Sequence, residues 1–421
     1  MELERRRRAV AERWNLDSEV VLIEAGEPLH VPGRADLTYP FRAHSEYFYF
    51  TDRERPGGVL AFDPQEGWVD FVAPVTKDEL LWSGGVEGED GGVSVSELRS
   101  WLEKRNGRRV AVLGAPVSDA ESDAELEPVL RYGLNDVRRR KDEVELERMR
   151  AAERATAAGF AAVQPLIRPG ATEREVQIEL EAEFFRAGAD FLGFETIVAG
   201  GPHSAVLHFM PTQRAFGEGE LVLIDAGGEV QGYASDVTRT YPASGTLDPE
   251  QAALHSLVRE AGLAATKACL AGTEWRDVHR TAALVVGEGL VDFGLLRGEP
   301  DSLLEQGAIT AFFPHGIGHM VGLGIRDAGD PLEGRDGIYP GFPRLRFDRP
   351  LEPGHVVTVE PGIYFVPSLL RDPELRERQR DTVDWERTDR MLDFGGIRIE
   401  DNVLVTEDGF EVLTADVPVL P

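Results

Sequence analysis

The segment at residues 221–242, LVLIDAGGEVQGYASDVTRTYP, constrains the fold of this chain most. Its apolar start predicts a buried strand ending at Asp225, glycines then allow a tight turn, and a second strand leaves through Asp236. If the hairpin is centred between Val230 and Gln231, the two aspartates face each other with Cβ atoms about 5 Å apart. Like charges at that spacing destabilise a sheet unless a cation lies between them or one binds a proton. The alternative is a loop with two solvated aspartates.

Two more acids and a pair of histidines lie in comparable settings. Glu360 ends an apolar run and precedes Pro-Gly, and Glu400 closes the alternating segment GGIRIE, on the same face as Arg398. The segment FFPHGIGH places His315 and His319 four residues apart among apolar residues and glycines. A salt bridge to Arg398 would also explain Glu400, and a lone buried histidine is more often a core residue than a ligand.

Taken together, these side chains predict a metal site. Carboxylates with one imidazole form an oxygen-dominated ligand set, which suits Mn²⁺ or Co²⁺ and leaves Mg²⁺, Fe²⁺ and Zn²⁺ as further candidates. Four carboxylates and a histidine exceed what one small ion needs, but they suit two ions about 3.5–4 Å apart.

The charge balance and cysteine content limit the remaining functions. Among 421 residues, 75 are acidic and 45 basic, so the net charge of −30 disfavours nucleic acid and anionic membranes as partners. Cys269 is the only cysteine, which excludes an intrachain disulfide and a thiolate metal cage. Because the start of the chain lacks the apolar core of a signal peptide and no apolar run approaches about 20 residues, we expect a soluble, cytoplasmic protein.

The chain is expected to form two domains that meet near residue 135. In residues 1–135, short apolar runs separated by Pro-Gly and Gly-Gly, among them Tyr47–Phe50, predict the strands of a small α/β domain. In residues 136–421, a capping box at Thr172–Glu175 opens a helix, and helical pairs flank non-consecutive strands that include a run at Ile397–Val405. This pattern is typical of an α+β domain.

The motifs at Asp225/Asp236, His319, Glu360 and Glu400 resemble those of the dinuclear metallopeptidases with the pita-bread fold. The resemblance is to their Xaa-Pro peptidase branch, prolidase and aminopeptidase P, and covers roughly residues 138–415. It implies that all five of these residues ligate metal, with His319 rather than His315 as the histidine ligand. More loosely, YPFR and HSEYFYF in the N-terminal domain resemble the creatinase/prolidase-like domain of this family.

The resemblance also implies roles for other residues and a reaction. His208 contacts the substrate near the scissile bond, His315 helps to move protons, and Arg398 lies beside the metals. Two divalent ions that share a water lower its pKa towards neutrality, so a metal-bridging hydroxide would attack the Xaa-Pro imide bond. Glu360, as ligand and base, would pass a proton to the leaving nitrogen.

Whether such an enzyme cleaves dipeptides or longer peptides depends on which side chains contact the C-terminal end of the substrate. Arg346 aligns with the arginine that holds the carboxylate of a dipeptide in prolidases, so we expect a prolidase most similar to the bacterial ones. The alternatives are an aminopeptidase P, which acts on longer Xaa-Pro peptides, and a retired binding scaffold, which predicts missing ligands. Arg326 stands where the family often has a histidine that contacts the substrate. That contact is therefore either absent here or taken over by Arg326, which could bind a carboxylate directly. Arg344, Arg346 and Arg349 could instead simply solvate a loop in an arginine-rich chain. The family also implies Mn²⁺ and a homodimer.

Overall fold

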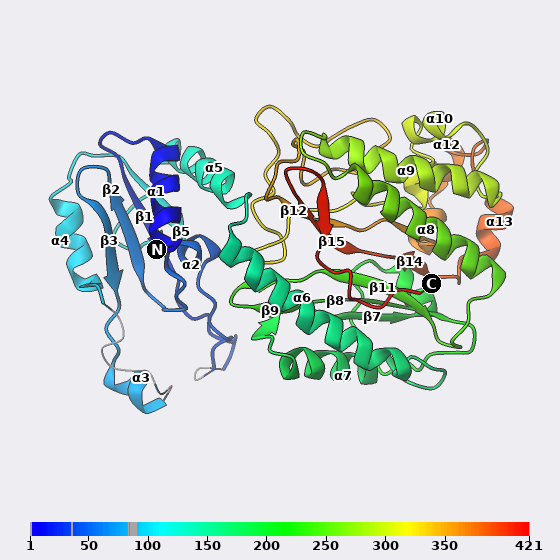
Figure 1. Ribbon diagram of the computed structural model, residues 1–421, viewed down its shortest axis with the longest axis horizontal. Coiled ribbons are helices and arrows are strands. Elements are labelled where there is room, and N and C mark those ends of the chain that lie inside the picture. The colour runs from blue at the N-terminus through cyan, green and yellow to red at the C-terminus, as the bar shows by residue number, and fades with distance from the viewer. Residues whose placement is uncertain (1, 35–36, 83, 85–90, 421) are drawn as a thin grey trace. The chain divides into compact units, whose positions relative to one another are not determined.

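The computed structural model describes residues 2–34, 37–82, 84 and 91–420. The chain divides into two compact units, Met1–Arg138 and Arg139–Pro421, each visible in Figure 1. The division lies close to the boundary expected near residue 135. Among the described residues, no helix is both long and apolar enough to cross a membrane.

The first unit is built on a mixed five-stranded sheet with the strand order β4-β3-β2-β1-β5. Strand β1 pairs antiparallel with β2 and parallel with β5. The strands are β1 (Val20–Glu24), β2 (Val59–Asp63), β3 (Gly67–Val72), β4 (Val93–Ser94) and β5 (Val110–Gly114), and the helices are α1 (Glu2–Trp14), α2 (Ser45–Thr51), α3 (Lys77–Trp82), α4 (Leu98–Glu103) and α5 (Leu126–Arg138).

The prediction of a strand at Tyr47–Phe50 is wrong, because this run lies in helix α2. His44 precedes the helix, and its Nδ1 accepts a hydrogen bond from the Glu46 amide at 3.3 Å. All four aromatic residues of the run are buried. A short, continuous apolar run fits a buried strand and a buried helix equally well, so its sequence pattern did not separate the two.

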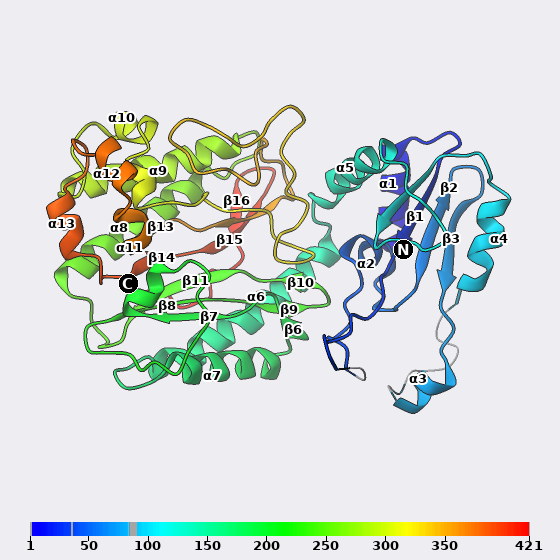
Figure 2. The ribbon, with the colours of Figure 1, turned by 180° about the vertical axis from the view of Figure 1, so that it is seen from behind.

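The second unit places helices outside a set of small curved sheets, which confirms the expected α+β class. Figures 1 and 2 show the α6–α7 pair on one side of these strands and the α8–α9 pair on the other. The longer helices are α6 (Glu143–Val163), α7 (Glu173–Arg186), α8 (Pro249–Ala268) and α9 (Trp275–Asp292), followed by the short α10 (Pro300–Glu305), α11 (Pro367–Leu370), α12 (Pro373–Arg378) and α13 (Trp385–Arg390).

Four sheets make up the strand layer of this unit. Their orders are β10-β9-β6, β11-β8-β7, β12-β15-β16 and β13-β14. The bounds are β6 (Phe191–Leu192), β7 (Ile197–Gly200), β8 (Leu221–Ala226), β9 (Gly228–Val230), β10 (Tyr233–Ala234), β11 (Val237–Pro242), β12 (Val356–Val359), β13 (Gly362–Tyr364), β14 (Gly396–Arg398), β15 (Asp401–Val405) and β16 (Phe410–Val412).

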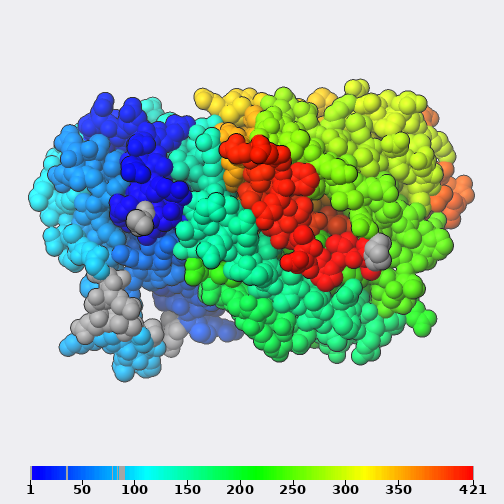
Figure 3. All heavy atoms as spheres, viewed as in Figure 1, coloured from blue at the N-terminus to red at the C-terminus, as the bar shows by residue number. Residues whose placement is uncertain are grey.

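Two apolar clusters hold the helices against the strands. One surrounds α8 and α9, with Trp275 fully buried, and the other lies between α6, α7 and the β7–β8 strands. Helix α7 approaches α6 closely at Gly159, where a Cβ atom would lie 2.4 Å from the Phe184 ring. On the face shown in Figure 3, the C-terminal residues lie beside α6, and Arg150 forms an ion pair with Glu411 at 2.9 Å.

The register of the central hairpin differs from the expected one by two residues. Thr238, not Asp236, faces Asp225, because the turn is centred on Gln231 and Gly232. Both turn residues have positive φ angles, 49° and 83°, as a two-residue hairpin turn of type I′ requires. A shift of two residues preserves the face of a strand, so the two aspartates still share one face.

Candidate active site

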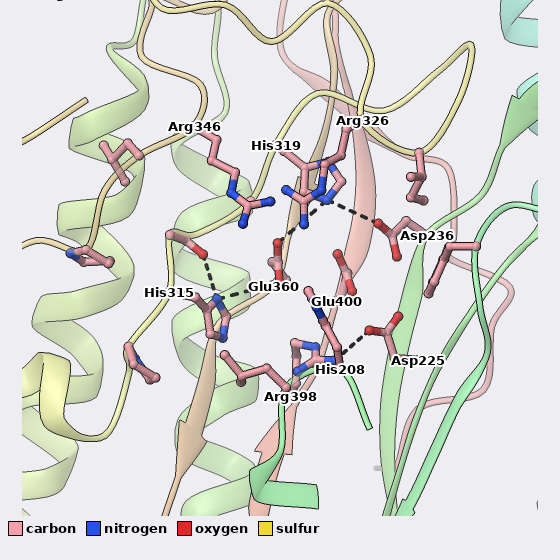
Figure 4. A pocket seen from close by; sticks show the side chains of 18 of the residues that line it. His208, Asp225, Asp236, His315, His319, Arg326, Arg346, Glu360, Arg398 and Glu400 are labelled. Carbon is pink, nitrogen blue, oxygen red and sulfur yellow. Dashed lines mark hydrogen bonds and ion pairs between the residues drawn. The ribbon is translucent and has the colours of Figure 1, made fainter. Parts of the chain in front are cut away.

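One cavity of about 900 Å³ in the second unit is lined by every side chain for which the sequence suggested a role. They come from segments up to nearly two hundred positions apart and point into a common space in Figure 4. These residues are His208, Asp225, Asp236, His315, His319, Arg326, Arg346, Glu360, Arg398 and Glu400.

The strand ends position the acidic residues. Asp225 lies on β8, Asp236 directly precedes β11, and Glu360 directly follows β12. Glu400 was expected within one strand over Ile397–Val405, but β14 ends at Arg398 and β15 begins at Asp401. The strand breaks there because the chain changes partner: β14 pairs with β13, whereas the Glu400 amide donates to the Thr238 carbonyl at 3.0 Å.

His319 reaches the site because its loop packs directly against β12. Its amide donates to Thr358 Oγ1 at 3.1 Å, and the Thr358 amide donates to its carbonyl at 2.8 Å. The preceding Gly318 allows this approach, since a Cβ atom there would lie 2.0 Å from the Thr358 carbonyl oxygen. His319 Nδ1 donates to the Met320 carbonyl at 2.9 Å, which leaves the Nε2 lone pair directed at the carboxylates.

Three of these side chains form a compact donor group. Ligand atoms of Asp236, His319 and Glu400 all lie within 4.8 Å of one another. His319 Nε2 is 3.4 Å from Asp236 Oδ2 and 4.0 Å from Glu360 Oε1. The fourth carboxylate, that of Asp225, also lines the cavity. Its Oδ1 is buried and has no hydrogen-bond partner in the described part of the chain.

The electrostatics of this cluster fit a site for divalent cations. Burial raises the pKa of Asp236, Glu360 and Glu400, and the neighbouring carboxylates raise the pKa of each further. Charged carboxylates this close, removed from water, are unfavourable unless cations offset them. Asp225 Oδ1, which has no hydrogen-bond partner among the described residues, and the Nε2 lone pair of His319 are the kind of donors that such cations need.

Arg398 connects the acids to two residues that sequence reasoning missed. Its Nη2 donates to Asp225 Oδ2 at 2.6 Å, its Nη1 to the Tyr364 hydroxyl at 2.8 Å, and its Nε to Thr238 Oγ1 at 2.9 Å. Thr238 Oγ1 in turn donates to Glu400 Oε2 at 2.7 Å. Two signals were available: Thr238 follows Asp236 by two residues in an extended segment, and Tyr364 follows Glu360 within TVEPGIYF.

His315 lies at the end of this hydrogen-bonded chain. Its Nδ1 donates to the Gly316 carbonyl at 2.8 Å and is 3.7 Å from Glu360 Oε2. Burial lowers the pKa of His315 to about 3, so the ring is neutral near pH 7 and its Nε2 accepts from the Tyr364 hydroxyl at 2.8 Å. Hydrogen bonds therefore join His315, Tyr364, Arg398 and Asp225, and Glu360 lies 3.7 Å from the His315 ring.

Exposed side chains of both charge signs line the cavity, among them Glu195 and Asp336. His208, Arg326 and Arg346 are exposed there, and Arg344 also lines the cavity. Arg326 and Arg346 form no ion pair within the described ranges, and Figure 4 shows both guanidinium groups directed towards the region of His319 and Glu360. Their mutual repulsion is the largest cause that lowers the pKa of Arg346.

Comparisons with known proteins agree with this geometry. Residues 147–407 match metallopeptidase family M24, and residues 3–104 match the N-terminal domain of aminopeptidase P. A probable Xaa-Pro aminopeptidase from Botryotinia fuckeliana is 30% identical over 413 residues, 94% of this chain and 89% of that protein. The Xaa-Pro aminopeptidase of Haemophilus influenzae is 32% identical over 440 residues, 99% and 94% of the two chains.

Solved structures give the same result. The Pseudomonas aeruginosa aminopeptidase PepP has a TM-score of 0.82 and 30% identity, and the match covers 100% of this chain and 95% of that one. A zinc-substituted Escherichia coli aminopeptidase P in complex with product has a TM-score of 0.80 and 29% identity, covering 100% and 96%.

These relatives correct one expectation and confirm another. The matched proteins are Xaa-Pro aminopeptidases, so the expected similarity to bacterial prolidase gives way to similarity to aminopeptidase P. The expectation of a metallopeptidase domain preceded by a smaller N-terminal domain is confirmed by both matched regions. This chain belongs to metallopeptidase family M24, the pita-bread-fold metallopeptidases.

Proposed function

We propose that this protein is an Xaa-Pro aminopeptidase, which releases the N-terminal residue from peptides that have proline in second position. The observation that carries the proposal is the single cavity lined by four carboxylates and His319. Relatives that are named Xaa-Pro aminopeptidases align with both the N-terminal unit and the catalytic unit, which supports this specificity over dipeptide cleavage.

Two divalent cations would be held by Asp225, Asp236, His319, Glu360 and Glu400. We propose Mn²⁺, with Co²⁺ or Zn²⁺ as alternatives, because the donors are mostly carboxylate oxygens. When bound, such ions would activate a water molecule as the nucleophile and polarise the carbonyl of the scissile bond.

The remaining residues would handle protons and hold the substrate. Glu360, whose pKa is raised by burial, would take a proton during the attack and deliver it to the leaving nitrogen. The neutral ring of His315, 3.7 Å from Glu360, is placed to assist that transfer. His208 on the exposed rim would contact the substrate beside the scissile bond, and Arg398 would hold Asp225 in place.

A second candidate function is dipeptide hydrolysis, and the two rim arginines favour it. Arg326 and Arg346 line the cavity without a carboxylate partner in the described chain, and a forked guanidinium binds a carboxylate at two points. The C-terminal carboxylate of an Xaa-Pro dipeptide is a ligand of that kind.

Hydrolysis of three peptides by the Mn²⁺-reconstituted protein tests these alternatives. We expect glycine release from Gly-Pro-Ala with a higher kcat/KM than from Gly-Pro, and no release from Gly-Ala-Ala. A clear preference for Gly-Pro would establish the dipeptidase instead. Comparable cleavage of Gly-Ala-Ala would contradict both candidates, since neither tolerates the loss of the imide bond.

A further inference from the structure

Behind the cavity, the carboxyl of Glu153 on α6 is almost fully buried, with 3% of the residue exposed. Both of its oxygens are hydrogen-bonded. Ser235 Oγ donates to Oε2 at 2.5 Å, and Asn402 Nδ2 donates to Oε1 at 2.8 Å. Glu153 does not line the cavity, so it cannot itself contact substrate there.

The two partners of Glu153 belong to the segments that carry two candidate ligands. Ser235 directly precedes Asp236, and Asn402 follows Glu400 by two residues. Both partners are completely buried. One carboxyl group therefore joins the β10–β11 junction to the start of β15, directly behind two of the three side chains whose ligand atoms lie within 4.8 Å of one another.

We propose that Glu153 is a positioning residue that clamps these two segments and thereby sets the separation of the Asp236 and Glu400 carboxylates. The inference rests on the ligand set proposed above. Groups that hydrogen-bond directly to metal ligands typically change metal affinity 10–100-fold when they are removed. Glu153 acts one residue further away, through Ser235 and Asn402, and we expect an effect of the same order.

Attachment of α6 to the sheet does not by itself explain this arrangement. The same helix also bonds to the hairpin elsewhere: Thr156 Oγ1 accepts from the Gly228 amide at 2.9 Å, and Tyr233 donates to Glu145 Oε1 at 2.9 Å. Neither contact reaches a second ligand-bearing segment. Asn402 depends on the clamp, because its side chain makes no other hydrogen bond within the described residues and its Oδ1 is buried without a partner.

The charge state of Glu153 suits this position. Burial raises the pKa of Glu153 to about 8, so the group is mostly neutral near pH 7. A neutral carboxyl adds no charge behind the clustered carboxylates of the cavity. A neutral Glu153 can donate its own proton to the Ser235 hydroxyl, which then accepts instead of donating, while its other oxygen accepts from Asn402. Glutamine has the same shape and reproduces this arrangement through its amide, whereas leucine cannot.

Calorimetric titration of Mn²⁺ into the metal-free full-length protein tests the clamp. We expect Glu153→Leu to raise the Kd for Mn²⁺ about 10–100-fold and Glu153→Gln to restore the parent value. The matched control is Tyr233→Phe, which removes a hydrogen bond between the same helix and hairpin and is expected to leave the Kd unchanged. The thermal midpoint of each metal-free variant shows whether it is folded.

Parent affinity in a folded Glu153→Leu variant would overturn the proposal, as would equal weakening by Tyr233→Phe. If Glu153→Leu does not fold, Ser235→Ala carries the test: weaker binding with an unchanged metal-free midpoint supports the clamp, and parent affinity refutes it. Failure of the parent protein to bind Mn²⁺ would instead refute the ligand set, so the two failures are distinguishable.

Discussion

Arg398 Nη2 lies 2.6 Å from Asp225 Oδ2, in a buried ion pair that joins β14 to β8. The pair occupies one oxygen of Asp225 and leaves Oδ1 free to face the cavity. The same guanidinium also donates to Thr238 and Tyr364, so a single side chain orients several members of the site.

Replacement of Arg398 by methionine should be strongly destabilising. Asp225 would be left as an unpaired, buried charge, which typically costs about 3–5 kcal/mol in the free energy of unfolding. Urea denaturation of the metal-free protein measures this loss. The control is Arg297→Met, which breaks the exposed pair with Asp384 and is expected to cost less than about 1 kcal/mol. Equal losses of unfolding free energy in the two variants would show that the buried pair stabilises the protein no more than the exposed pair does.

Tyr364→Phe should impair catalysis more than its effect on stability suggests. The change leaves His315 Nε2 without a donor and Arg398 Nη1 without an acceptor, at a cost of about 1–3 kcal/mol in unfolding free energy. We expect kcat for Gly-Pro-Ala to fall as well. Tyr241→Phe is the matched control, because its buried hydroxyl bonds the Pro418 carbonyl at 2.6 Å, and it should lower stability but not kcat. Unchanged kcat in Tyr364→Phe would show that its hydrogen bonds to His315 and Arg398 do not contribute to catalysis.

Stabilisation by metal should depend on pH in a definite direction. Since burial raises the pKa of Asp236, Glu360 and Glu400, these groups bind protons more tightly in the folded than in the unfolded metal-free chain. These three groups make their full contribution to the free energy of unfolding below about pH 4, and that contribution is lost as the pH rises through their raised folded-state pKa values. Divalent cations bind the deprotonated forms and offset that loss. The increase in Tm on adding Mn²⁺ should therefore be larger near pH 8 than near pH 5.5; an increase independent of pH would contradict the raised pKa values.

Arg326→Ala tests whether the rim binds a carboxylate. If Arg326 holds the C-terminus of a dipeptide, the substitution should raise KM for Gly-Pro about tenfold, which corresponds to roughly 1.4 kcal/mol. The amide Gly-Pro-NH₂ is the control substrate, because it lacks the charge and should be unaffected. Equal effects on the acid and the amide would assign Arg326 a role other than carboxylate binding.

The sequence predicted the candidate ligands because local patterns marked them. Asp225 is the penultimate residue of the apolar strand β8 and Glu360 directly follows the apolar strand β12, and a charge in such a place is unusual unless it has a function. The hairpin register was harder to predict from the sequence. It depends on a positive φ at Gln231, a residue type that does not signal such a turn, and the sequence therefore suggested a centre one residue earlier.

Contacts between distant segments account for most of what the sequence did not show. The place of Tyr364 after Glu360 in the sequence did not indicate its hydrogen bonds to His315 and Arg398. Glu153 is marked only by its bonds to Ser235 and Asn402. None of these pairs is close enough in sequence for a helical or strand period to connect them. The prediction for the buried run Tyr47–Phe50 was wrong for another reason, since full burial removes the periodicity that separates helix from strand.

The most direct test of the central claim is the Mn²⁺ content per chain after reconstitution, measured together with Gly-Pro-Ala hydrolysis in the parent and in Asp236→Asn. Asparagine keeps the shape of the side chain but removes the charge that a bound cation requires. We predict two Mn²⁺ ions and hydrolysis in the parent, and fewer ions with no hydrolysis in Asp236→Asn. Two tightly bound ions and full activity in Asp236→Asn would contradict the proposed two-metal site.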